Sequence, residues 1–183
     1  LNLADNALCG VKYGGGTYDA SGIKALASAI AGSGVLNRIV LSCNQIQDKG
    51  AIAIGESLKT NKSLKELKLN RCGIGAEGVK AIAHSGMEVL NSITLDHAPP
   101  LPVKKLKGTD PVETLNLSSK RLGVASAVVI ASLIGVNGAV LTDLNLRNNG
   151  IGAEGAKGIA DALASGKAVL RSEEHTSELQ SRQ

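Results

Sequence analysis

Residues 36–58 read LNRIVLSCNQIQDKGAIAIGESL, and this stretch decides the fold. Its first half has the pattern L-x-x-I-x-L-x-x-N-x-I, in which Ile39 and Leu41 occupy alternate positions, as in a short β-strand. Its second half spaces apolar residues at i, i+3 and i+7 between Ala51 and Leu58, which is typical of one face of a helix. The stretch therefore predicts a strand, a turn and a helix.

The same unit recurs along the chain. Its strand halves begin at intervals of 22 to 29 residues, at Leu36, Leu64, Leu90, Val112 and Leu141. A truncated copy opens the chain, and Leu170 stands where another copy would begin. One such unit cannot bury its own apolar face, whereas stacked units bury a continuous core. We therefore expect the strands to form a parallel sheet and the helices to form an outer layer.

A polar or small residue recurs where the chain turns off each strand. An asparagine there can bond the exposed backbone of neighbouring turns, and a cysteine can do so more weakly. Ala98 and Lys120 stand at this position in the two middle units, so we expect the ladder to be interrupted there. The expected structural ladder consists of Asn6, Asn44, Cys72 and Asn149.

Together, L-x-x-L-x-L-x-x-N/C-x-I and G-A-x-x-I-A-x-x-L resemble the ribonuclease-inhibitor type of leucine-rich repeat. This version is found in ribonuclease inhibitor, in the sensor ends of NOD-like receptors and in the Ran GTPase-activating protein. The resemblance covers about residues 1–170. It implies an α/β leucine-rich-repeat solenoid, a segment of a horseshoe, with parallel strands on the concave side and helices on the convex side.

Two segments depart from the pattern. Residues 9–19 are an insertion that holds Gly14, Gly15 and Gly16 and both tyrosines. Residues 98–111 contain a proline-rich segment where the normal turn and much of the helix would be expected. Proline has no backbone N–H to donate and disrupts a helix, so the regular unit is not expected there. We expect local irregularity in both segments, and a change of curvature at the second.

Residues 171–183 resemble the in-frame translation of a sequencing-library adapter. We expect this tail to be a disordered artefact and exclude it from the fold. We also expect the chain to be a fragment, because it begins at a leucine and the next repeat would begin at Leu170.

The composition excludes several classes of protein. Aromatic residues make up 1% of the chain, so base-stacking folds have no platforms, and the charge of +4 is scattered, which argues against nucleic acid as a partner. No apolar run is long enough to span a membrane. The three cysteines are odd in number and form no C-x-x-C pair, so neither a disulfide framework nor a zinc site is indicated. Reduced cysteines fit a cytoplasmic protein.

No residues are spaced for catalysis. His84 and His97 have no cysteine, serine or further histidine placed to make a triad or a metal site. The glycine run at 14–16 lacks the lysine of a phosphate-binding loop. We therefore expect a protein that is not an enzyme, with no catalytic residue, cofactor or metal.

The strand face is the best candidate for a binding surface. Residues between and after the two strand leucines point away from the core, and they form columns of mixed polar groups. The expected partner-binding residues are Lys68, Asn70, Arg71, Thr94, Asp96, His97, Asn116, Asn145 and Arg147.

These observations favour a non-catalytic module or scaffold that binds another protein through the repeat surface. The resemblance leaves two alternatives open. One is the sensor region of a NOD-like-receptor-like protein. The other is a GTPase activator of the Ran type, in which an arginine stabilises the transferring phosphate in trans. Arg38, Arg71 and Arg147 lie on or beside strands, but nothing local distinguishes them from solvated arginines.

Overall fold

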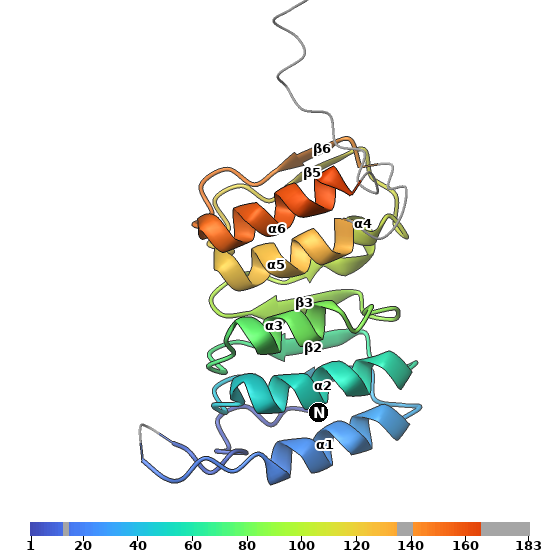
Figure 1. Cartoon of the computed structure of the whole chain (residues 1–183). Helices are drawn as coiled ribbons and strands as arrows, with labels where there is room; N and C mark the ends of the chain where they lie inside the picture. The colour runs from blue at the N-terminus through green and yellow to red at the C-terminus, as the bar shows by residue number, and fades with distance from the viewer. Residues whose placement is uncertain (13–14, 135–140, 166–183) are drawn as a thin grey trace, which may run out of the picture.

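A computed structural model of the chain describes residues 1–12, 15–134 and 141–165. Strands and helices alternate along most of the chain (Figure 1). The helices are α1 (Ser21–Gly32), α2 (Gln47–Thr60), α3 (Ala76–Ala83), α4 (Val103–Lys107), α5 (Gly123–Ile134) and α6 (Gly152–Ala164). The strands are β1 (Arg38–Val40), β2 (Glu66–Leu69), β3 (Ser92–Leu95), β4 (Leu101–Pro102), β5 (Thr114–Asn116) and β6 (Asp143–Asn145). The expectation for 171–183 lies outside the described residues.

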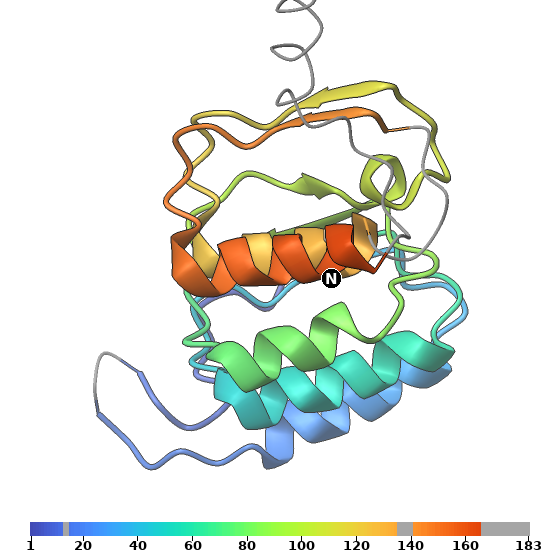
Figure 2. The ribbon, with the colours of Figure 1, turned by 45° about the horizontal axis from the view of Figure 1, so that its top comes forward.

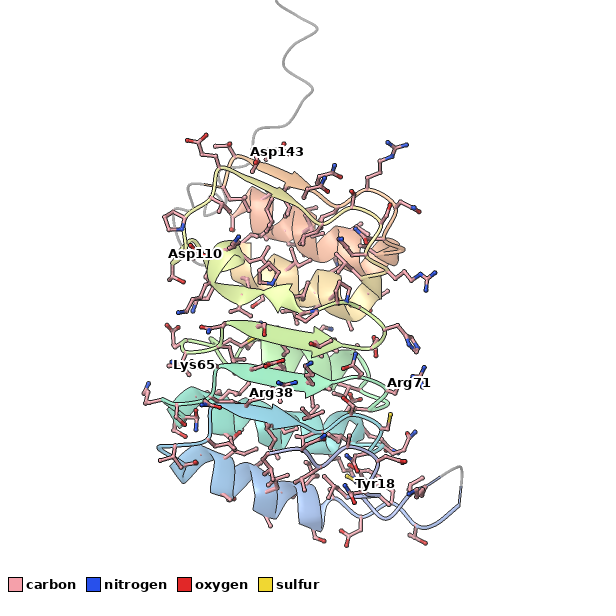
Figure 3. The ribbon with its side chains drawn as sticks, turned by 180° about the vertical axis from the view of Figure 1, so that it is seen from behind. Tyr18, Arg38, Lys65, Arg71, Asp110 and Asp143 are labelled. Carbon is pink, nitrogen blue, oxygen red and sulfur yellow. The ribbon has the colours of Figure 1, made fainter. Side chains whose placement is uncertain are left out.

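The strands form two sheets. In the first, β1, β2 and β3 are parallel neighbours and β4 pairs antiparallel with β3. In the second, β5 and β6 are a parallel pair. The N-terminal residues extend the first sheet beyond β1, since the backbone N–H of Leu3 donates to the carbonyl of Val40 at 2.8 Å. The long helices cover one side of the strands, and the opposite side is open (Figures 1 and 3).

The core lies between the strands and the helices. The parallel register aligns Ile39 with Leu67 and Leu67 with Ile93, and all three side chains are fully buried. Equivalent residues of successive units thus stack on one another, as the repeat predicts. The helices close this core with buried aliphatic side chains of similar size, including Ile23, Ile30, Ile54, Val79 and Ile82.

A small residue in the first helical turn lets neighbouring helices approach closely. A Cβ added at Gly78 of α3 would lie 2.8 Å from the Cβ of Ala51, and one added at Gly155 of α6 would lie 2.6 Å from the Cβ of Ala127. Ser126 occupies this position in α5, where its hydroxyl is buried and has no hydrogen-bond partner. The small residue in the first turn of these helices therefore reflects helix-to-helix contact.

The insertion at 9–19 folds back on the first units. The Tyr18 hydroxyl donates to the carbonyl of Ile46 at 2.8 Å, and Cys9 is fully buried. Lys12 and Gly15 form an isolated antiparallel bridge. Tyr13 and Gly14 lie outside the described residues. The insertion is therefore anchored at both ends, by Cys9 on one side and Tyr18 on the other.

Residues 98–111 do not form a regular unit. Pro102 ends the antiparallel β4 strand, which pairs with β3 through Leu101. The following helix, α4, has 5 residues and is capped at its C-terminus by Gly108, which has a φ of 76°. Lys107 at the end of α4 is 5% exposed, and its ammonium group donates to the carbonyl of Gly86 at 2.7 Å.

This irregular segment separates the two sheets. β4 occupies the edge of β3, and β5 pairs with β6 instead of with β3. The helix layer continues across the break, because the hydroxyl of Ser132 in α5 donates to the carbonyl of Ala83 in α3 at 2.9 Å. Figure 2 shows β5 and β6 standing apart from β3 while α3, α5 and α6 remain neighbours. Among the described residues, no helix has both the length and the apolar character needed to cross a membrane.

Candidate functional site

The open face of the first sheet carries an ion-paired row of charges (Figure 3). The Arg38 guanidinium on β1 lies 3.2 Å from the Glu66 carboxylate on β2. The ammonium group of Lys68, two residues along β2, lies 3.3 Å from the same carboxylate. We expected Lys68 to bind a partner. In the structure its ammonium group forms an ion pair with the Glu66 carboxylate. Arg38, one of the three arginines considered above, is likewise paired.

Asn70 links neighbouring turns across the same face. Its side-chain N–H donates to the carbonyl of Asp96 at 2.8 Å, and its amide oxygen accepts from the Ser42 hydroxyl at 3.3 Å. These contacts join the ends of β1, β2 and β3 laterally. Asn70 and Asp96 were both expected to bind a partner. In the structure the Asn70 side chain and the Asp96 carbonyl also link neighbouring turns of the sheet.

Thr94 is not on an accessible surface. Its side chain is only 4% exposed, and its hydroxyl has no hydrogen-bond partner. The strand alternation predicted an outward-facing, accessible residue, and that expectation of access is wrong because Thr94 is buried. Thr94 is therefore removed from the candidate binding residues.

Asn116 and Asn145 are exposed at the ends of β5 and β6. The side-chain oxygen of Asn116 accepts from the backbone N–H of Ser118 at 2.9 Å, and that of Asn145 accepts from the N–H of Arg147 at 3.0 Å. Each side chain thus shapes its own turn. The backbone around both is held in place, which orients the exposed amide groups towards solvent.

The turns at the carboxyl ends of the strands carry exposed cations. Arg71 follows β2 and is labelled at this edge in Figure 3, and Arg147 follows β6. His97, which follows β3, is also exposed. Lys120 and Arg121 follow β5 at the same edge, and both are exposed although the sequence did not single them out for binding. The signal that could have found them is the lack of any acidic residue between Glu113 and Asp143.

The recurring turn residues make inter-unit hydrogen bonds. Asn44 is fully buried; its amide oxygen accepts from the backbone N–H groups of Asn6 at 2.9 Å and Leu8 at 3.2 Å. Its amide N–H groups donate to the carbonyls of Leu3 at 2.7 Å and Leu41 at 2.9 Å. Asn44 therefore satisfies four backbone groups in two adjoining turns.

Asn149 plays the same part in the second sheet. Its amide oxygen accepts from the backbone N–H of Lys120 at 2.8 Å, and its N–H donates to the carbonyl of Leu117 at 2.7 Å. Cys72 makes only a long thiol contact, 3.3 Å from the carbonyl of Leu41. Asn6 is exposed, and its side chain donates to the carbonyl of Ala4 within its own turn.

Two of the three cysteine thiols have raised pKa values. Burial raises the pKa of the Cys72 thiol to about 12, and burial with the nearby charge of Asp19 raises the pKa of the Cys9 thiol. A raised pKa keeps the thiol neutral and unreactive near neutral pH. Cys43 is exposed, and all three thiols are free.

Two grooves lie between helices in the described part of the chain. The larger, of about 640 Å³, lies between α3, α5 and α6, and its floor includes Val128 and Ala131. An ion pair of 3.6 Å between Lys80 and Glu154 joins its two walls. The smaller groove, of about 400 Å³, lies between α1 and α2. The α3 wall carries Lys80 and the α6 wall carries Glu154, Lys157 and Asp161, so charges of both signs line the larger groove.

The two histidines are not brought together for catalysis. The ring Nδ1 of His84 lies 2.7 Å from the carbonyl of Lys80 within the same helical turn. His97 lies on the turn after β3, on the strand side. Across residues 1–12, 15–134 and 141–165, no group of three or more His, Cys, Asp or Glu side chains could hold a metal ion.

Comparison with known proteins agrees with this architecture. The family described as Leucine Rich repeat matches residues 35–55, 60–83 and 139–160. The chain contains leucine-rich repeats. The three matched segments begin at or near the strand of a unit and reach into its helix. Leucine-rich repeats thus account for β1 with α2, for β2 with α3, and for β6 with α6.

Solved structures with leucine-rich-repeat domains are similar in fold. The leiomodin-1 structure titled actin-binding site 2 aligns with a TM-score of 0.51 at 17% identity, covering 90% of this chain and 79% of that one. The Caenorhabditis elegans tropomodulin C-terminal domain aligns with a TM-score of 0.47 at 17% identity, covering 90% and 81%. A search of curated proteins returned no match.

Proposed function

We propose that these leucine-rich repeats are a non-catalytic module that binds another protein through the open face of the strands. The observation that carries this proposal is a pre-formed polar surface. Its backbone is held by the sheet and by Asn44, Asn70 and Asn149, while Asn116 and Asn145 stay exposed. A surface that is ordered before binding loses little conformational entropy on association.

We further propose that the strands form the concave side of a solenoid segment. Three parallel strands in register with helices on a single side support this geometry, because a helix layer is wider than a strand layer and stacking therefore curves towards the strands. A concave strand face gives a partner contacts from several units at once. The similarity to the leiomodin-1 domain supports the fold only, at 17% identity.

A cytoplasmic location is part of the proposal. Three free thiols, two of them buried, support a reducing compartment. The exposed thiol of Cys43 would be open to oxidation elsewhere.

The test is site-specific photo-crosslinking in the cells that express the protein. A photoreactive amino acid replaces Asn116 or Asn145 on the strand face, or Ala25 or Ala160 on the helix face, where both alanines are exposed. The proposal expects the same discrete protein adduct from both strand-face positions and none from the helix face. Adducts from the helix face alone would overturn it.

A further inference from the structure

The turns after β5 and β6 carry a compact group of cations, which we call the basic edge: Lys120, Arg121 and Arg147. Their backbones are adjacent, since the N–H of Ser119 donates to the carbonyl of Arg147 at 2.8 Å. The N–H of Lys120 is held by the Asn149 side chain at 2.8 Å. The three side chains are exposed, and among the described residues none of them forms an ion pair.

The acidic residues nearest in sequence lie towards the other ends of the two strands. Glu113 immediately precedes β5 and Asp143 is the first residue of β6, whereas the basic edge follows the carboxyl ends of both strands. Glu154, the next acidic residue along the chain, is paired with Lys80 at 3.6 Å on the helix side.

The first sheet contrasts with this arrangement. On its open face Glu66 pairs with both Arg38 and Lys68, at 3.2 and 3.3 Å. At its carboxyl edge Lys12 lies 3.7 Å from the Asp5 carboxylate. In the first sheet Arg38, Lys68 and Lys12 are thus paired within the chain, although Arg71 is not, whereas all three cations of the basic edge are exposed without an ion pair among the described residues.

We propose that the basic edge is the docking site for a carboxylate-rich segment of the partner protein. Two guanidinium groups offer planar pairs of N–H donors that match carboxylates, and the lysine adds a third positive charge. The proposal rests on the proposed function, because it names the chemistry of the partner's contacting segment. A nucleic acid fits less well, because base stacking needs aromatic side chains, and these make up only 1% of the chain.

The test uses the whole 183-residue chain and a fluorescent octaglutamate peptide, followed by fluorescence anisotropy at low and physiological salt. The triple variant Lys120→Gln, Arg121→Gln, Arg147→Gln is expected to weaken binding by about ten-fold or more, from three exposed ion pairs. Glutamine suits these turns, since Gln45 and Gln47 already adopt positive φ angles as Arg121 does. Far-ultraviolet circular dichroism checks that the variant is folded.

Two controls separate site from total charge. The variant Lys49→Gln, Lys62→Gln, Lys157→Gln removes the same charge from exposed sites elsewhere and should change affinity less than about two-fold. The pair Arg121→Lys, Arg147→Lys keeps the charge but removes the planar pairs of N–H donors, so it should weaken binding, though less than the triple variant does. Equal losses in both triple variants, or no preference for octaglutamate over an uncharged peptide, would overturn the proposal. So would tighter binding of a single-stranded oligonucleotide of equal charge.

The outcome is distinct from that of the crosslinking experiment. Adducts from Asn116 and Asn145 without octaglutamate binding would leave the module intact and reject the acidic segment. Octaglutamate binding at the basic edge without adducts would reject the open strand face as the partner surface and leave the edge as a local acidic-peptide site.

Discussion

The carboxylate of Asp48 in α2 accepts a hydrogen bond from the backbone N–H of Gly78 in α3 at 2.9 Å. The same oxygen accepts from the N–H of Gly75 at 2.8 Å. One helix therefore caps the next, because the side chain of Asp48 satisfies two of the unpaired N–H groups at the start of α3. Its negative charge also suits the positive end of the α3 dipole.

Replacing Asp48 with alanine should destabilise the fold by about 1 to 2 kcal/mol, the usual cost of a lost N-terminal cap. Urea unfolding followed by circular dichroism measures this change. Asp48→Asn is the matched control, because it keeps an oxygen acceptor and should cost less. Equal stability of the alanine variant and the parent chain would show that water replaces the carboxylate.

Asn44→Ala should be the most destabilising of the asparagine variants. It leaves the N–H groups of Asn6 and Leu8 and the carbonyls of Leu3 and Leu41 without their partner. A cost of about 3 kcal/mol is expected, because each buried unsatisfied group carries about 1 kcal/mol or more. Thermal unfolding measures it, with Asn6→Ala as the control of small effect. A loss no larger than that of Asn6→Ala would contradict the role of Asn44.

Thr94→Val should stabilise the protein by up to about 1 kcal/mol, because valine has the same shape and lacks the buried hydroxyl that has no partner. Chemical unfolding of the two chains gives the difference. Thr94→Ser keeps the hydroxyl and removes a methyl group, so it should destabilise instead. Stabilisation by Thr94→Ser without stabilisation by Thr94→Val would show that bulk at this site, and not the hydroxyl, is at fault.

Gly78→Ala should destabilise the fold by about 2 kcal/mol through overpacking. The added Cβ would lie 2.7 Å from the Asp48 carboxylate oxygen and 2.8 Å from the Cβ of Ala51. Gly32→Ala at the end of α1 is the control, because a Cβ there meets nothing within 4 Å and alanine favours helix. The control should be neutral or slightly stabilising. A shift in the same direction for both variants would argue against close helix contact at Gly78.

Thiol labelling of the native protein near neutral pH should modify Cys43 alone. The pKa of Cys72 rises from its ordinary value of 9.0 to about 12 with burial, so its thiol stays protonated when the chain is folded. The folded state therefore holds this proton more tightly than the unfolded state. Stability is expected to be unaffected below pH 9 and to fall as pH rises from 9 towards 12.

Mass spectrometry of peptides after alkylation, with and without urea, identifies the modified cysteines. Cys9 and Cys72 should react only with the urea-unfolded chain. Rapid labelling of Cys72 in the folded chain would show that the turn of the second unit opens readily.

The repeat itself was predictable because it is local. Alternation at Ile39 and Leu41 and helical spacing at Ile54 and Leu58 are set by neighbouring residues, and the parallel pairing of β1 to β2 and β2 to β3 agrees with them. The match to Leucine Rich repeat confirms that part of the prediction. Thr94 was predicted wrongly because alternation along a strand gives the direction of a side chain and not what other parts of the chain cover it.

The binding surface was less predictable, because it depends on contacts between residues far apart in sequence. The outward column that contains Lys68 could be read from alternation, but its ion pair with Glu66 could not. Lys120 was read only as a residue unable to continue the asparagine ladder. Its place beside the turn of Arg147 emerges when β5 pairs with β6, since that pairing brings two turns 29 residues apart into contact.

The amino-acid sequence by itself therefore determined a repeating strand-and-helix unit and the aliphatic residues that stack inside it. Both follow from periodicities of 2 and 3.6 residues, which act over short distances along the chain. The tertiary structure alone decided where the sheet divides between β3 and β5, which charges are paired and which remain open to solvent. Those features depend on contacts between residues far apart in sequence, and hydrogen-bond register and packing select them.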